Sequence, residues 1–157
     1  MKRLVLALLS TVALLLFLPS AAASADTVTE HHVTESIHDA VPCVGDATIT
    51  ITYNAVEHFS QAANGSLHAT FTQTGTFSAV LDAGGTSSGR FTMWGNFNSS
   101  ADGSMGNTTF TFNGTVKSGV GAGTSWHENM HFTGPFDADG NPQFDLAKVA
   151  FDKFTCH

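Results

Sequence analysis

The segment 127–131, with the sequence HENMH, places two histidines and a glutamate at a spacing that can do chemistry. On a helix, residues four apart lie on one face, so His127 and His131 could bind one zinc ion together. Glu128 could then be the base that activates a water bound to the metal. The segment therefore raises the hypothesis of a zinc-dependent hydrolase.

The longer string HENMHFTGPFD fits H-E-x-x-H-x-x-G-x-x-D and resembles small secreted metzincin-type proteases of the snapalysin kind. The resemblance implies a zinc ion bound by His127, His131 and Asp137. A metzincin also needs a methionine turn below its metal, and no methionine follows Asp137. Three glycines before the motif and Pro135 after it leave room for about ten helical residues, which is a marginal length. We interpret the match as coincidental and favour no metal here.

Residues 125–132 form a coherent pattern if they are a β-strand. Alternation places Trp126, Glu128 and Met130 on one face and the two histidines on the other. The histidines would then lie about 13 Å apart, at ~3.3 Å per residue, which is too far for one zinc ion. Glu128 would be a carboxylate between large apolar neighbours. We predict that Trp126, Glu128 and Met130 contact a ligand.

Other roles for the carboxylates stay open. Glu128 could be the acid of a cyclase or hydrolase, because isolated carboxylates in cavities are candidate acids. It could instead be structural, paired with Tyr53, Arg90 or a backbone amide, because a buried carboxylate needs a partner. Glu57 is a weaker candidate of the same kind, if a bulge near Asn54 turns it to the apolar face.

The first 25 residues read as a secretory signal peptide. A short basic start precedes an apolar run over residues 4–18, and residues 23–25 fit the A-x-A cleavage rule. The apolar run is shorter than the ~20 residues that a transmembrane helix needs. We expect a secreted protein whose single domain spans residues 26–157, with no membrane span in that domain.

Charge and cysteine content limit the partners and the compartment. The chain carries 13 acidic residues and a net charge of −7, which disfavours nucleic acid and anionic lipid as partners. Its two cysteines, Cys43 and Cys156, are expected to form a disulfide in an oxidising compartment. The bridge would bring His157 near His38 and two aspartates, where solvated polar residues are favoured over a surface metal site.

The pattern of the remaining sequence has a period of two. ATITITY, SLHATFTQTGTFSAVL, RFTMWGNF and TTFTFNGTVK each alternate apolar residues with threonine or other polar residues. This alternation is typical of half-buried antiparallel strands. Turn signals such as Asn64-Gly65 separate the runs. We predict an all-β fold of seven or eight antiparallel strands in a meander. Closure into a barrel is favoured over a sandwich, because an apolar face recurs on every run and closure removes exposed edges.

The order ITITYN, TQTGTFS, GRFT, FTFNGT and WHENMHF resembles a group of small secreted bacterial proteins of unassigned function. The chain is more distantly similar to the dirigent and allene-oxide-cyclase-like barrels. That likeness implies an eight-stranded antiparallel barrel with an apolar cavity and carries over no catalytic residue. The sequence thus predicts a secreted β-barrel that binds a small apolar molecule, with zinc proteolysis, or cyclase or hydrolase chemistry at Glu128, as alternatives.

Overall fold

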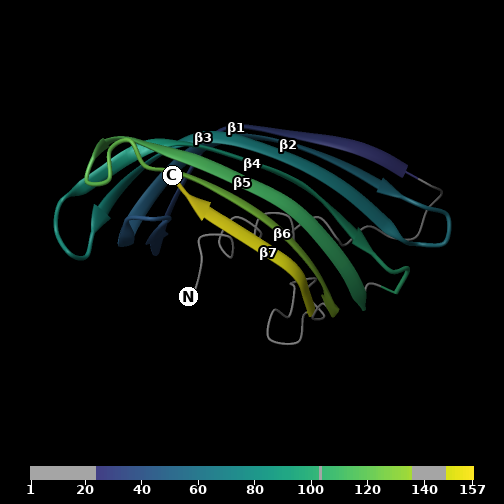
Figure 1. Cartoon of the computed structure of the whole chain (residues 1–157). Coiled ribbons are helices and arrows are strands. Elements are labelled where there is room, and N and C mark those ends of the chain that lie inside the picture. The colour runs from purple at the N-terminus through teal and green to yellow at the C-terminus, as the bar shows by residue number, and fades with distance from the viewer. Residues whose placement is uncertain (1–23, 103, 136–147) are drawn as a thin grey trace.

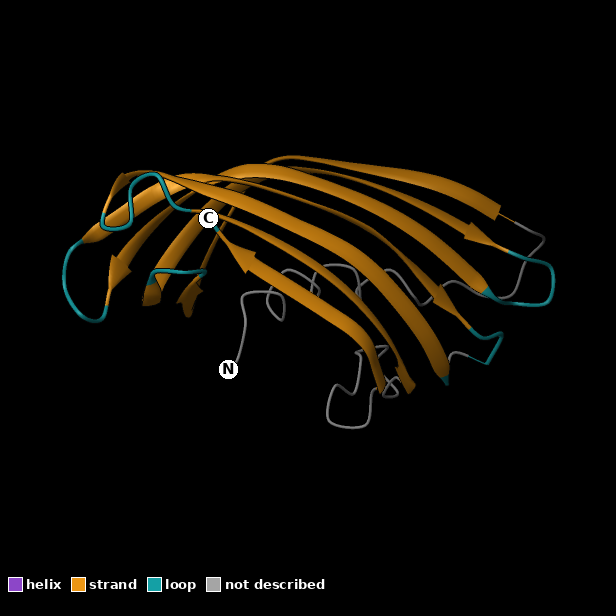
Figure 2. Cartoon of the chain, in the orientation of Figure 1, coloured by secondary structure: helices purple, strands orange, loops and turns teal. Residues whose placement is uncertain are grey.

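The computed structural model describes residues 24–102, 104–135 and 148–157, and the regular structure in these ranges is β-strand throughout (Figures 1 and 2). The strands are β1 (Ser24–Val41), β2 (Gly45–Gln61), β3 (Leu67–Leu81), β4 (Thr86–Ser99), β5 (Met105–Gly119), β6 (Ser125–Pro135) and β7 (Lys148–Cys156). Each strand pairs antiparallel with the next one in the chain. The predicted all-β antiparallel meander is confirmed. The described ranges contain no helix that is long and apolar enough to cross a membrane. The predicted signal peptide lies outside them, except for its last two residues.

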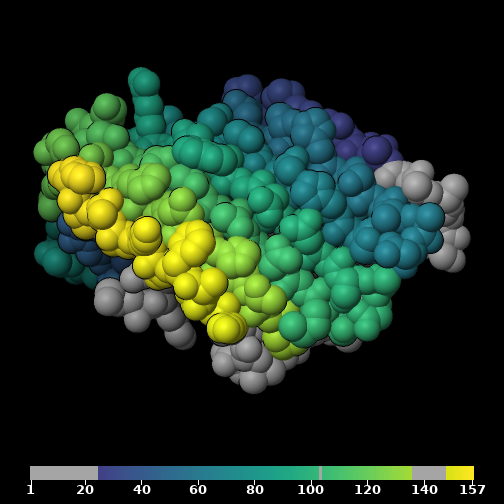
Figure 3. Space-filling view, turned by 45° about the vertical axis from the view of Figure 1, so that its right-hand side comes forward, coloured from purple at the N-terminus to yellow at the C-terminus, as the bar shows by residue number. Residues whose placement is uncertain are grey.

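The sheet is strongly curved and open (Figure 1). β1 and β7 are its two edges, since the strand order runs from β1 to β7 without return. In the space-filling view, β7 (yellow) and β1 (purple) follow opposite borders of the molecule (Figure 3). Within the described residues the barrel favoured by the sequence is therefore not closed by hydrogen bonds. The two edges also differ in length, since β7 has 9 residues and β1 has 18.

The apolar face of the alternating strands is the concave side of the sheet. Pro42, in the turn after β1, and Trp126 on β6 line the same small cavity, which requires that the sheet curl towards this side. Threonines such as Thr48 and Thr50 occupy the opposite, convex face of β2 and are exposed. The core residues are Val41, Ala47, Ile49, Ile51, Tyr53, Ala55, Phe71, Phe77, Ala79, Leu81, Phe91, Met93, Phe110, Phe112, Val116, Trp126 and Phe132.

Turns and one disulfide complete the frame. The β2–β3 hairpin turns at Asn64-Gly65, as predicted, with Gly65 at φ 90° and a hydrogen bond from the Ser66 amide to Asn64 Oδ1 (3.0 Å). Cys43, in the β1–β2 turn, is bonded to Cys156 at the end of β7, which confirms the predicted bridge. The disulfide therefore joins one edge strand to the hairpin that carries the other edge.

Candidate functional site

The HENMH segment lies in strand β6, which confirms the strand prediction and excludes the helical geometry of a zinc-protease motif. His127 is exposed and its Nδ1 contacts Asn113 Oδ1 on β5. His131 Nδ1 lies 2.7 Å from Thr109 Oγ1, and its ring stacks on Phe151 at 5.9 Å between centroids. Both histidines thus contact residues on the convex face of neighbouring strands.

Glu128 lies on the other side of the strand from the two histidines. It is 2% exposed, whereas His127 beside it is exposed to solvent. A base that activates a metal-bound water must lie on the metal's side, so this strand cannot assemble the zinc site. Asp137, the third ligand of that hypothesis, lies outside the described residues. In the part of the chain that the structure describes, no group of three histidine, cysteine, aspartate or glutamate side chains could hold a metal ion.

The three residues predicted to contact a ligand do share the concave face. Trp126 and Glu128 are buried, and Met130 is partly buried against the core. Across the sheet, Glu128 is in register with Phe112 on β5 and Phe154 on β7. The expectation that strand alternation sets a carboxylate among large apolar side chains is therefore confirmed. The hydroxyl of Tyr53, one of the structural partners suggested for Glu128, donates to Glu35 Oε1 (2.9 Å).

Gln73 is a site residue that the sequence reading missed. It lies on β3 in the same row as Glu128, through the register Gln73–Met93–Phe112–Glu128. Its side chain is 1% exposed, and its Oε1 has no hydrogen-bond partner. The signal was present in TFTQTGTF, where Gln73 takes the parity of Phe71 and Phe77 and so interrupts an apolar face.

Trp126 carries a second buried polar atom that is not satisfied. Its ring is 3% exposed and its Nε1 has no hydrogen-bond partner. Trp126 pairs with Gly114 in the row next to the one that contains Gln73. Buried polar atoms in native proteins are nearly always hydrogen-bonded, so each exception calls for an explanation. Here one acceptor and one donor are unmet on adjacent rows of one face.

Glu57 adds a carboxylate to the concave face, on β2. It is 6% exposed, and burial, together with the negative charge of Glu30, raises its pKa. The bulge near Asn54 lies in β1 and not in β2: the register shifts after Glu30, and the His32 amide donates to Asn54 Oδ1 (2.9 Å). β2 itself stays regular, so plain alternation turns Glu57 inward.

The disulfide end of the interior is filled. Trp126 lies 5.6 Å from Phe112 and 5.9 Å from Phe77 between ring centroids, and Phe91 lies 6.2 Å from Phe112. The cavity left among these rings is about 10 Å³, barely the space of one water. A ligand enclosed at this end, as a barrel cavity would hold it, is therefore excluded. The unmet Gln73 Oε1 lies one row further from the disulfide than Trp126 and directs attention to that part of the concave face.

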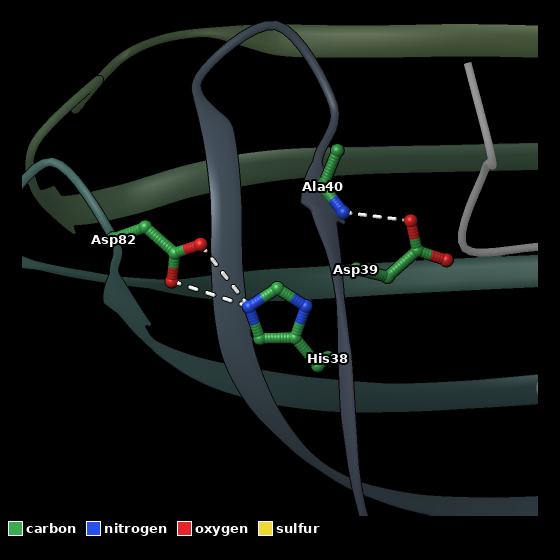
Figure 4. Close-up of polar contacts among 4 residues, drawn as sticks. All are labelled: His38, Asp39, Ala40 and Asp82. Atoms are coloured by element: carbon green, nitrogen blue, oxygen red, sulfur yellow. Dashed lines mark hydrogen bonds and ion pairs between the residues drawn. The ribbon is translucent and has the colours of Figure 1, made fainter.

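A polar cluster at the end of β1 and in the β3–β4 turn makes no comparable site (Figure 4). His38 Nε2 lies 3.1 Å and 3.3 Å from the two carboxylate oxygens of Asp82, and both residues are exposed. Asp39 Oδ1 accepts from the Ala40 amide (2.7 Å). Partial burial raises the pKa of Asp39, and the nearby Asp46 adds to that effect. The solvated reading of this region is the one that the geometry supports.

No family model, curated protein or solved structure matches this chain. The geometry of the chain is therefore what informs its function.

Proposed function

We propose that the chain is a secreted binding protein that holds a small, mostly apolar ligand against the concave face of its sheet. Glu128 is a polar contact for that ligand, and Trp126 and Met130 contact its apolar part. The disulfide between Cys43 and Cys156 and the leader-like first 25 residues support export into an oxidising compartment.

The observation that carries the proposal is the pair of unmet polar atoms among apolar side chains. Gln73 Oε1 and Trp126 Nε1 are buried without partners. Ligand sites are mostly apolar surfaces with a few placed polar groups, and a ligand that satisfies both atoms would recover the cost of their burial. Met93 and Phe112, between Gln73 and Glu128 in the row, supply apolar surface.

A fluorescence titration tests the proposal. The neutral dye N-phenyl-1-naphthylamine, which brightens in apolar surroundings, is titrated into the purified exported protein. We expect saturable enhancement that small apolar molecules displace and that Glu128→Gln weakens. The matched control is His127→Gln, one residue away on the opposite face of β6, which should bind like the wild type. Absence of saturable enhancement, or equal weakening by the two variants, would contradict the proposal.

A further inference from the structure

Several acceptors meet on the concave face of β1, β2 and β3. Gln73 Oε1 is an unmet acceptor with the side chain 1% exposed. Glu57 is in register with Phe71, two residues before Gln73 on the same face of β3, so the carboxylate and the amide are diagonal neighbours. Glu30 lies opposite Ala55 and acts electrostatically on Glu57. Gln73 Oε1 is therefore an acceptor without a hydrogen-bond donor, and it lies close to two carboxylates.

The basic residues among those described do not supply that donor. Arg90, Lys117, Lys148 and Lys153 are all exposed. Arg90 is in register with Thr115, which follows the inward-facing Gly114 on β5. Lys153 is in register with Asn129, which follows the inward-facing Glu128 on β6. Both basic side chains therefore point to the convex side. The carboxylates of Glu57 and Glu30 consequently repel each other without a described cation between them.

Apolar and aromatic side chains surround these acceptors. Gln73 lies between Ala55 and Met93 in its row, and Phe71 and Phe110 occupy the next row. Aromatic faces attract cations, and the attraction grows when the cation is desolvated. A neutral polar group would meet the hydrogen bond to Gln73 alone, whereas a cation with an apolar body would also offset the two carboxylates and pack against the rings.

We propose that the ligand is a protonated amine with an apolar body, whose ammonium group donates to Gln73 Oε1 and the Glu57 carboxylate. This assignment rests on the proposed function and names its ligand class. Glu30 contributes negative charge, and Phe71 and Phe110 contact the carbon skeleton. In the free protein, burial and the charge of Glu30 raise the pKa of Glu57 and no described positive charge offsets its carboxylate. Binding of an ammonium group therefore favours the ionised form of Glu57.

The test compares two probes that differ in one group. 1-Naphthylmethylamine is protonated at neutral pH, and 1-naphthylmethanol has the same ring with a hydroxyl instead. Each is titrated into the exported protein, and we expect the amine to bind at least about tenfold more tightly, as for a hydrogen bond to a charged group. Glu57→Gln and Gln73→Leu should each remove about tenfold from the amine. Affinity for the alcohol should change little.

Controls separate the possible failures. His58→Gln, next to Glu57 on the convex face, should leave both affinities unchanged. Alcohol binding equal to or tighter than amine binding overturns the amine assignment while the apolar-ligand proposal stands. Amine preference that survives both Glu57→Gln and Gln73→Leu also overturns it. Failure of both probes, with no enhancement of N-phenyl-1-naphthylamine, removes the proposed function itself.

Gln73→Leu should in addition raise the Tm of the free protein, because it removes an unmet buried amide. This rise shows that weaker binding does not come from unfolding.

Discussion

The indole ring of Trp126 on β6 occupies the space where a side chain of Gly114 on β5 would begin. The two residues are paired in register, and a Cβ built on Gly114 would fall within contact of three atoms of the ring. The same relationship recurs on the concave face between Gly89 on β4 and the ring of Phe77 on β3. An aromatic ring laid over a glycine of the next strand allows the sheet to curl tightly without losing apolar cover.

Gly114→Ala should therefore destabilise the fold although alanine suits a strand better than glycine. The added methyl group must displace the Trp126 ring or the strand, and overpacking of this kind costs about 1–3 kcal/mol. Urea unfolding measures the loss. Thr115→Ala, on the convex face, is the control and should change the free energy of unfolding by less than about 0.5 kcal/mol. In a Trp126→Leu background the cost of Gly114→Ala should shrink, and an unchanged cost would contradict the steric account.

Loss of the disulfide should cost about 3–5 kcal/mol, because the bridge closes a loop with a sequence separation of 113. Urea unfolding with and without reductant measures this in the wild type. The variant Cys43→Ser/Cys156→Ser should match the reduced wild type and ignore the reductant.

The bridge also holds Cys43 in an unusual conformation. Cys43 has φ 66° at the third position of the turn, after Pro42, where the backbone favours glycine. In the absence of the bridge, Cys43→Gly should thus be more stable than Cys43→Ser by up to about 1 kcal/mol. The opposite order would show that the turn changes conformation when the bridge is lost.

Glu57→Gln should stabilise the free protein at neutral pH. Burial, then the charge of Glu30, raises the pKa of Glu57 above its ordinary 4.5, so the folded state binds more protons than the unfolded state as this carboxyl titrates. Wild-type stability therefore falls as pH rises from about 4.5 through the folded pKa, and a glutamine avoids that loss. On β3, the residues near Glu57 are Phe71 and Gln73, and neither side chain titrates. Glu30 is thus the charged neighbour of Glu57.

Thermal unfolding between pH 4 and pH 8 measures the difference. The Tm advantage of Glu57→Gln should be large at pH 8 and vanish at the acid end. His58→Gln, on the opposite face, should show no such trend towards alkaline pH. A Gln variant that is less stable at every pH would mean that Glu57 makes a favourable contact in the ionised form.

The parts of the site that follow from alternation could be predicted from sequence. A period of two assigns each residue to a face, and it placed Trp126, Glu128 and the two histidines of β6 correctly. The disulfide followed from the two cysteines of the chain and from the expectation of an oxidising compartment. Gln73 obeys the same rule, but Gly75 and the surrounding threonines make its run look polar, so its inward position was overlooked.

The curvature and the open edges could not be predicted in the same way. Local pattern reports which face of a strand is apolar, whereas closure depends on whether strands far apart in sequence reach each other. β7 pairs with β6 across a register shift after His131 and then ends at the disulfide. The bridge draws it to the β1–β2 turn without a ladder, and no short sequence window contains that relationship.

Zinc binding through HENMH is the alternative that most needs a direct measurement, because the sequence match is long. We expect that the protein, purified without chelators, contains no stoichiometric zinc. In strand β6 the two histidines lie about 13 Å apart at ~3.3 Å per residue, and zinc ligands must each come within about 2 Å of the metal. Their side chains contact Asn113 and Thr109 instead.

Elemental analysis of the wild type and of His131→Ala measures the metal content, and isothermal titration with zinc measures the affinity. Zinc at about one per chain that is lost in His131→Ala would show that the segment leaves the strand to bind metal, and it would restore the protease hypothesis. Equal, weak zinc uptake by both proteins is the expected result, since the described residues contain no group of three histidine, cysteine, aspartate or glutamate side chains that could hold a metal ion.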